Sequence, residues 1–251
     1  MRRDGAGFYL LLVLAASVPF YALGALWDRF PGLPIALPPS SLVVLVPVAL
    51  AVLLGGRSML ARALDLRRAP PGAVLLALLL PPALLAVAAL AQRLLGQDLP
   101  AFAFDPTTVA VMIAMFLLGA LCEEIGWQGY AWPRLAAGRS VLAASLGLGL
   151  FWAFWHIPGF IQTGHPAEWI VLHLAVTVLL RVQIIAVYRA GHDSVALAAL
   201  FHASCNLAFF LFPTWGSADD PGAFLLVLAL FILWNAALRP GLRRDWHACG
   251  S

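Results

Sequence analysis

The stretch VAVMIAMFLLGALCEEIGWQGY, residues 109–130, joins a long apolar run to two adjacent carboxylates. Glu123 and Glu124 are the only glutamates in the sequence apart from Glu168. Ionisable side chains at membrane depth are costly to bury and usually serve a function. The pair therefore indicates a buried functional site rather than ordinary surface charge.

The composition is that of a membrane protein. Of the 251 residues, 63% are hydrophobic and only 11% are charged, which lies far outside the range of soluble domains. The chain has no lysine, and its arginines lie mostly at the ends of apolar runs. The net charge of +3 therefore does not indicate nucleic-acid binding. We expect the lipid bilayer as a partner and no nucleic acid.

Apolar runs long enough to cross a bilayer, roughly 20 residues each, recur along the whole chain. They cover residues 7–27, 38–56, 72–96, 106–130, 140–158, 167–190, 193–213 and 221–238. The first run is longer than the core of a typical signal peptide, so we expect it to remain as a spanning helix. The pattern predicts an all-α, polytopic membrane protein with about eight transmembrane helices in one bundle, a single transmembrane domain over residues 1–251.

The arginines predict which side of the membrane each loop faces. With a cytoplasmic N-terminus, the inner segments hold Arg2, Arg3, Arg57, Arg62, Arg67, Arg68, Arg134, Arg139, Arg189, Arg239, Arg243 and Arg244. The outer loops then hold Arg29 and Arg93 with the acidic residues Asp98, Asp105, Glu168, Asp219 and Asp220. Because positively charged loops stay inside, we expect a multi-pass protein of the cell membrane with both termini cytoplasmic.

The two carboxylates cannot share one task. Adjacent helical residues point about 100° apart, so Glu123 and Glu124 face different directions. Gln128 lies four residues after Glu124, on the same face of an α-helix. We therefore expect one carboxylate to face a reacting centre while Gln128 holds its neighbour.

The polar residues of two later runs can reach the same depth. The turn expected near residues 138–140 lies almost equally far from Glu123 and from His156, so an antiparallel pair of helices brings these side chains level. His202 and Asn206 lie four residues apart, on one stripe of a further helix. The three helices can then meet at one buried polar site.

Other buried polar groups and aromatics have simpler interpretations. Arg181 lies within an apolar run and is expected to face a polar interior rather than lipid. His173 is expected to be a hydrogen-bond partner between helices. The tryptophans are compatible with an interfacial belt; they are Trp127, Trp132, Trp152 and Trp155.

Three short motifs in this order resemble those of the CPBP family, the CAAX protease and bacteriocin-processing intramembrane endopeptidases (Abi-type). That family has a Glu-Glu pair followed four residues later by Arg, an aromatic residue four before a His, and His-x-x-x-Asn. The matching segments are residues 123–128, 152–156 and 202–206. Two positions depart from the pattern: Gln128 stands where the family usually has Arg, and Trp152 where it usually has Phe. We expect the aromatic exchange to be mild, whereas Gln128 can hydrogen-bond to Glu124 but cannot neutralise it.

The resemblance implies an intramembrane endopeptidase that hydrolyses a peptide bond of a peptide or membrane-protein substrate. Glu123 would act as general base on a water that His156 orients, and His202 and Asn206 would donate hydrogen bonds to the oxyanion. Glu124, Gln128 and Trp152 would support the site. The resemblance does not identify the substrate.

Alternatives within the enzyme class use some of the same residues. Glu and His bind zinc, but the chain has no His-Glu-x-x-His helix motif, and Trp127 stands where a di-iron bundle would have His. We predict no cofactor and no metal ligands, with zinc the metal these residue types would suit. A hydrolase built on Cys205 and His202 lacks an evident third group.

Two further classes are not enzymes. A catalytically impaired family member could act as a membrane scaffold or a bacteriocin-immunity protein, an interpretation that the missing cation at Gln128 favours. A transporter would show paired halves or discontinuous helices, and neither is evident in the sequence.

Overall fold

The computed structural model describes residues 5–26, 38–63, 65–66, 69–100, 105–212 and 220–238. Within these ranges every regular element is a helix. In chain order the elements are α1 (Ala6–Leu26), η1 (Pro39–Val44), α2 (Leu45–Gly55), α3 (Ser58–Ala63), α4 (Pro71–Leu94), α5 (Pro106–Glu124), η2 (Ile125–Ala131), α6 (Trp132–Ala136), α7 (Val141–Gln162), α8 (Ala167–Ala190), α9 (Val195–Leu211) and α10 (Pro221–Leu238).

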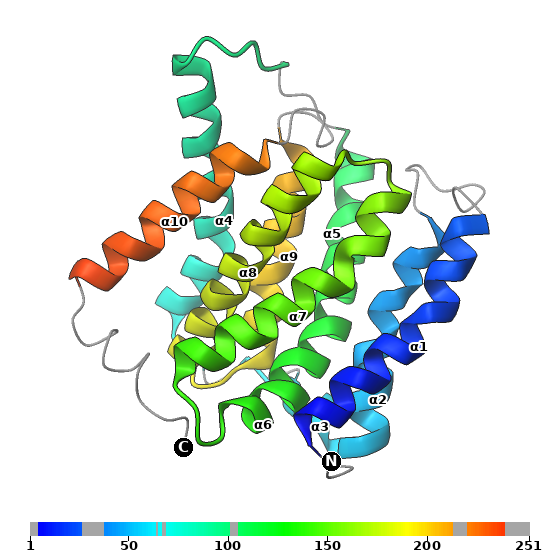
Figure 1. Cartoon of the computed structure of the whole chain (residues 1–251). Helices are drawn as coiled ribbons and strands as arrows, with labels where there is room; N and C mark the ends of the chain where they lie inside the picture. The colour runs from blue at the N-terminus through cyan, green and yellow to red at the C-terminus, as the bar shows by residue number, and fades with distance from the viewer. Residues whose placement is uncertain are drawn as a thin grey trace.

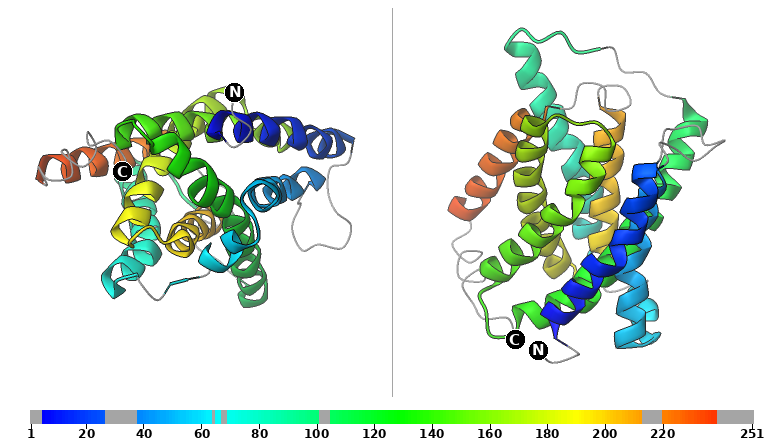
Figure 2. Two further views of the ribbon diagram at one scale, coloured as in Figure 1. Left: turned by 90° about the horizontal axis from the view of Figure 1, so that it is seen from below. Right: turned by 45° about the vertical axis from the view of Figure 1, so that its right-hand side comes forward.

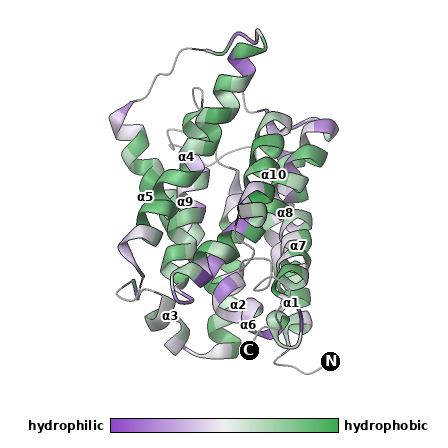
Figure 3. Cartoon of the chain, turned by 90° about the vertical axis from the view of Figure 1, so that its left-hand side faces the viewer, coloured by the Kyte–Doolittle hydropathy of each residue, from purple (hydrophilic) through white to green (hydrophobic). Residues whose placement is uncertain are grey.

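The predicted membrane bundle is confirmed in its helical content. In the described part of the chain, five helical segments are long and apolar enough to cross a bilayer: Ala6–Leu26, Pro71–Leu94, Pro106–Ala136, Val141–Gln162 and Ala167–Ala190. Three shorter apolar segments accompany them: Pro39–Gly55, Val195–Leu211 and Pro221–Ala237. Each predicted apolar run therefore corresponds to a helical segment, and Figure 3 shows the long helices coloured mainly as hydrophobic along their lengths.

The helices that carry the motifs lie at the centre of the bundle. Helices α7 and α8 pack against each other, and α9 packs against both α5 and α4 (Figure 1). Both views of Figure 2 place α1 and α2 on one flank and α10 on the opposite flank. This arrangement brings α5, α7, α8 and α9 around one interior.

Side-chain caps define where three of the central helices begin. Asp105 accepts a hydrogen bond from a backbone N–H three residues on, at 2.7 Å, and so begins α5. Ser140 and Ser194 make the same contact, each at 3.2 Å, at the start of α7 and α9. The Asp105 carboxylate accepts a hydrogen bond from the backbone N–H of Thr108, and this bond holds the pKa of the carboxyl group below its usual value. The caps satisfy backbone donors that each first turn leaves free.

Two predicted helix courses are wrong. Helix α7 does not end at Pro158 but continues to Gln162 with the proline inside it, which is tolerated in membrane helices because neighbouring groups compensate the lost hydrogen bond. The run expected to be α-helical to residue 130 ends as an α-helix at Glu124 and continues as the π-helix η2. The expected turn is confirmed, with Gly138 at a φ of 71°.

Part of the predicted orientation rests on residues outside the described ranges. These are Arg2, Arg3, Arg29, Arg67, Arg68, Arg239, Arg243, Arg244 and Asp219. The orientation therefore stays a prediction.

Gly126 allows three elements to meet beside the carboxylate pair. A Cβ at this position would lie 2.9 Å from the carbonyl carbon of Pro47 on α2, and it would also collide with the Tyr9 hydroxyl of α1. That hydroxyl donates a hydrogen bond to the Pro47 carbonyl oxygen at 2.9 Å. Only glycine therefore lets η2 pack this closely against α1 and α2.

The variant Gly126→Ala should destabilise the bundle by about 1–3 kcal/mol, the usual cost of overpacking a well-packed interior. Thermal unfolding of the purified protein in detergent would measure the loss. Gly119→Ala is the matched control, because a Cβ on Gly119 of the neighbouring α5 would meet no atom within 4 Å. Equal unfolding temperatures for the two variants would contradict the assigned role of Gly126.

Candidate functional site

The carboxylate pair lies where one helix type changes into another. Helix α5 ends at Glu124, and the π-helix η2 follows at once. Short π-helical segments occur often at functional sites, where they change the direction in which side chains point. Both carboxylates are buried, with 5% of Glu123 and 0% of Glu124 exposed. The sequence thus places two acids inside the protein at an irregular point of a helix.

Two indole rings hold one oxygen of Glu123. Trp127 Nε1 donates a hydrogen bond to Oε2 at 3.1 Å, and Trp152 Nε1 donates to the same oxygen at 2.8 Å. Hydrogen bonds to a carboxylate stabilise its charged form and fix its orientation. No side chain of the described residues donates a hydrogen bond to Oε1, so this oxygen keeps its capacity to accept one.

Glu124 is held by an arginine and a histidine from two other helices. Arg181 Nη1 of α8 donates to Oε2 at 2.7 Å and to Oε1 at 3.0 Å. His202 Nδ1 of α9 lies 2.9 Å from Oε1. Because an ionised carboxylate only accepts hydrogen bonds, Nδ1 carries the proton. Arg181 and Glu124 are both fully buried, so each charge depends on the other for compensation.

The predicted contact between Gln128 and Glu124 is wrong. Gln128 is fully buried, but neither its amide nitrogen nor its oxygen has a hydrogen-bond partner among the described residues. The prediction assumed an α-helical period through residue 128, whereas residues 125–131 form a π-helix with i→i+5 hydrogen bonds. The group that holds Glu124 is instead a cation, Arg181.

Trp152 connects the separate parts of the site. The Arg181 guanidinium carbon lies 3.9 Å from the centroid of the Trp152 ring. The rings of His156 and His202 stand edge-on to it, with centroids at 5.0 and 5.1 Å. Since the same indole donates to Glu123, one side chain contacts members of all three motifs.

His156 is oriented by its own helix. Its Nδ1 lies 2.7 Å from the backbone oxygen of Trp152, one turn earlier on α7. A carbonyl oxygen can only accept, so Nδ1 carries the proton and Nε2 is left as an acceptor. The described contacts thus join Glu123, His156 and His202 around Trp152.

Asn206 is less closely integrated. It lies one turn after His202 on α9 and is half-buried. Its side chain has no hydrogen bond to another described residue. Its predicted place beside the reacting atoms stays a prediction.

A close helix contact brings Arg181 to Trp152. A Cβ on Gly149 of α7 would lie 3.1 Å from the Val178 carbonyl oxygen and 3.2 Å from Arg181 Cβ. The absence of a side chain at Gly149 therefore allows α7 and α8 to approach at the level of the site. Arg181 faces the interior, as predicted. The prediction rested on its position as a single arginine within an apolar run.

The tryptophans do not form an interfacial belt. All four, Trp127, Trp132, Trp152 and Trp155, are buried inside the bundle. Two of them donate to Glu123, and Trp155 Nε1 donates to the Ser17 hydroxyl at 2.8 Å. Sequence alone did not reveal these roles, because it does not distinguish a buried tryptophan that donates a hydrogen bond from a tryptophan at a lipid interface.

A stack of rings from α8 and the loop before it packs against Phe160 of α7. His165 stacks on Trp169 with centroids 3.6 Å apart, and Trp169 stacks on His173 at 4.3 Å. His173 Nδ1 has no hydrogen-bond partner among the described residues, so the expected bond from that nitrogen is absent. Burial lowers the pKa of His165, which lies in the loop between α7 and α8, and so favours its neutral form.

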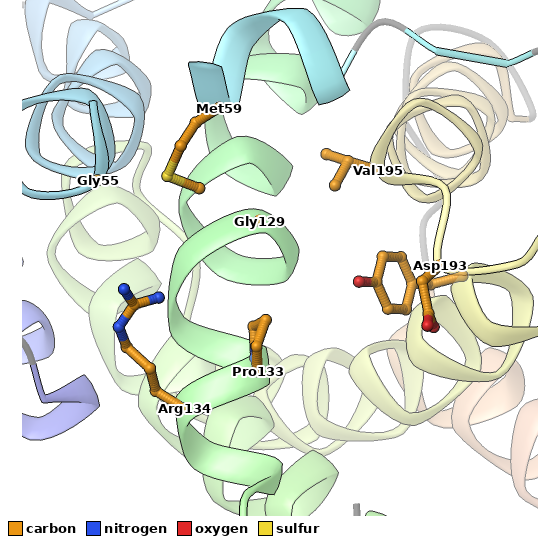
Figure 4. Close-up of a pocket in the computed structure, with 8 residues that line it drawn as sticks. Gly55, Met59, Gly129, Pro133, Arg134, Asp193 and Val195 are labelled. Carbon is orange, nitrogen blue, oxygen red and sulfur yellow. The ribbon is translucent and has the colours of Figure 1, made fainter. Parts of the chain in front are cut away.

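A cavity of about 360 Å³ lies beside η2, at the end of the bundle that holds α3 and α6 (Figure 4). Burial raises the pKa of Asp193 on its wall, and the positive charge of Arg189 acts in the opposite direction. None of the described side chains that hydrogen-bond to the Glu123 or Glu124 carboxylate lines this cavity. The lining residues are Gly55, Met59, Gly129, Pro133, Arg134, Tyr188, Asp193 and Val195.

In the described ranges, no three His, Cys, Asp or Glu side chains are grouped as metal ligands would be. Both oxygens of Glu124 are already engaged by Arg181 and His202. Cys205, considered as a nucleophile, is a free and buried thiol.

Comparison with known proteins agrees with the motifs. Residues 105–208 match the family model described as type II CAAX prenyl endopeptidase Rce1-like. The chain is also 28% identical over 172 residues to CAAX prenyl protease 2 of Methanococcus maripaludis. That alignment covers 62% of this chain and 64% of the relative. The matched region contains all three motifs and the helices that position them, so over this region the chain is similar to the CAAX prenyl endopeptidases.

Proposed function

We propose that this protein is an intramembrane endopeptidase in which Glu123 activates a water molecule for attack on a peptide bond. The observation that carries the proposal is the environment of Glu123. Two indoles hold its Oε2, its Oε1 has no side-chain donor, and a buried ion pair lies beside it. This arrangement suits a general base that must stay charged and oriented inside an apolar bundle.

The proposed reaction has two steps. Glu123 takes a proton from water as the water oxygen bonds to the carbonyl carbon, and the carbonyl π electrons move to the carbonyl oxygen. When the tetrahedral intermediate collapses, the C=O bond reforms and the C–N bond breaks. Glu123 returns the proton to the leaving nitrogen, so the products are a carboxylic acid and an amine. His156 Nε2 is available to hold the water, and Asn206 has a free amide to donate to the oxyanion.

The substrate class is taken from the relative. Because that protein is named a CAAX prenyl protease, we propose prenylated C-terminal peptides as the first substrates to test. The distribution of arginines supports a cell-membrane protein with both termini cytoplasmic.

The impaired-scaffold alternative loses its main physical support. It rested on the absence of a cation at Gln128, yet Arg181 provides a cation at 2.7 Å from Glu124. A charged, compensated pair is what a working site of this kind needs. We therefore favour the enzyme.

The variant Glu123→Gln should lower kcat by about 10²–10⁴-fold, the usual contribution of a general base. The amide keeps the size of the side chain and can still accept an indole hydrogen bond, so the fold should persist. Cleavage of an internally quenched farnesyl-cysteine peptide by purified protein in proteoliposomes would measure the loss. Peptide termini compared between wild-type and Glu123→Gln cells would identify natural substrates. Undiminished cleavage by the variant would exclude Glu123 as the base.

Replacing Trp152 with Phe should lower kcat by about 10- to 100-fold. The change removes one donor to the charged Glu123, worth about 1.5–3 kcal/mol, but keeps an aromatic ring beside Arg181. Trp132→Phe makes the same chemical change at a buried indole outside the site and is the matched control. A fully active Trp152→Phe variant would show that its indole N–H does not matter for the reaction.

Exhaustive chelation should leave the cleavage rate unchanged, because the proposed mechanism uses a carboxylate base rather than a metal-bound hydroxide. The measurement is the same peptide assay before and after treatment with a strong zinc chelator. A loss of activity that added zinc restores would contradict the metal-free mechanism.

A further inference from the structure

Arg181 has hydrogen-bond donors that its ion pair does not use. Its Nη1 makes both contacts with Glu124, but Nε and Nη2 have no hydrogen-bond partner among the described residues. The side chain is 0% exposed. Buried donors of a charged group are costly to leave unpaired, and exceptions in folded proteins call for a functional explanation.

The two unused nitrogens lie on one edge of a rigid plane. Nε and Nη2 form the side edge of the guanidinium, a fork with parallel donors that suits an oxygen atom. The guanidinium lies over the Trp152 ring at 3.9 Å, and Nη1 is fixed to Glu124. These two contacts hold the plane, and Trp152 also holds Glu123, the proposed base.

His202 is less suited to be the oxyanion donor that the family resemblance implies. Its Nδ1 proton is directed at Glu124 Oε1, 2.9 Å away. In the neutral ring the other nitrogen, Nε2, is then an acceptor and cannot donate to an oxyanion. His202 could donate there only as an imidazolium, whereas the guanidinium of Arg181 is charged at any physiological pH.

We propose that Arg181 is a catalytic residue whose Nε and Nη2 donate hydrogen bonds to the carbonyl oxygen of the scissile peptide bond. The inference rests on the proposed endopeptidase function. As the water oxygen bonds to the carbonyl carbon and its proton passes to Glu123, the π electron pair moves to the carbonyl oxygen. The Nε and Nη2 donors of Arg181 then stabilise the negative charge on that oxygen. On collapse the pair re-forms C=O, the C–N bond breaks, and Glu123 protonates the leaving nitrogen. Fixed donors in a dry site stabilise such developing charge strongly.

The variant Arg181→Lys separates the two roles of the arginine. An ammonium can still compensate Glu124, but it has no planar fork. With the farnesyl-cysteine peptide in proteoliposomes, kcat should fall by about 10²–10³-fold, the cost of losing an oxyanion donor, with little change in KM. Arg189→Lys, the same substitution at an exposed position in the last turn of α8, is the matched control.

Chemical rescue gives a second measurement that does not depend on how lysine fits. In Arg181→Ala, methylguanidinium at a non-denaturing concentration should restore part of the lost activity, whereas methylammonium should not. Double variants that also carry Glu123→Gln should not be rescued by either cation, because they lack the base.

The outcomes separate this inference from the function on which it rests. Full activity of Arg181→Lys, or equal rescue by both cations, would reduce Arg181 to a counterion of Glu124 and overturn the inference while leaving the endopeptidase intact. No cleavage by the wild-type chain, or full cleavage by Glu123→Gln, would overturn the proposed function and this inference with it.

Discussion

The ion pair between Arg181 and Glu124 constrains the centre of this protein more than any other contact. Neither partner is exposed, and the N–O distance is 2.7 Å. Breaking a buried pair by removing one partner typically costs about 3–5 kcal/mol, because the remaining charge is left uncompensated. Helices α5 and α8 must therefore keep their relative position, and the histidine contact to Glu124 extends this constraint to α9.

The two departures from the family motifs are connected through this pair. Where the motif usually has Arg, Gln128 makes no hydrogen bond to Glu124, and the cation comes from α8 instead. Where the motif usually has Phe, Trp152 offers a ring face to that cation and an N–H to Glu123. The three residues are thus best understood as one set, in which the tryptophan links the arginine to the second carboxylate.

The site is built where regular helix geometry is interrupted. The α-helix changes to a π-helix directly after the carboxylates, and Gly126 lets this segment pack against α1 and α2. Gly149 brings α7 and α8 together at the same level. Proteins often break local structural rules at functional sites and compensate through the surrounding packing.

The sequence alone determined the helical segments, the turn near Gly138 and the grouping of Glu123, His156 and His202. These follow from local properties: the length of apolar runs, the prolines and glycines between them, and equal distances from a turn. The partner of Glu124 was decided only by tertiary structure. Arg181 lies 57 residues away in the sequence, and its contact depends on how α8 is rotated and packed. The period that pointed to Gln128 fails because the helix changes type at Ile125, and a change stabilised by packing against α1 and α2 leaves no local signal in the sequence.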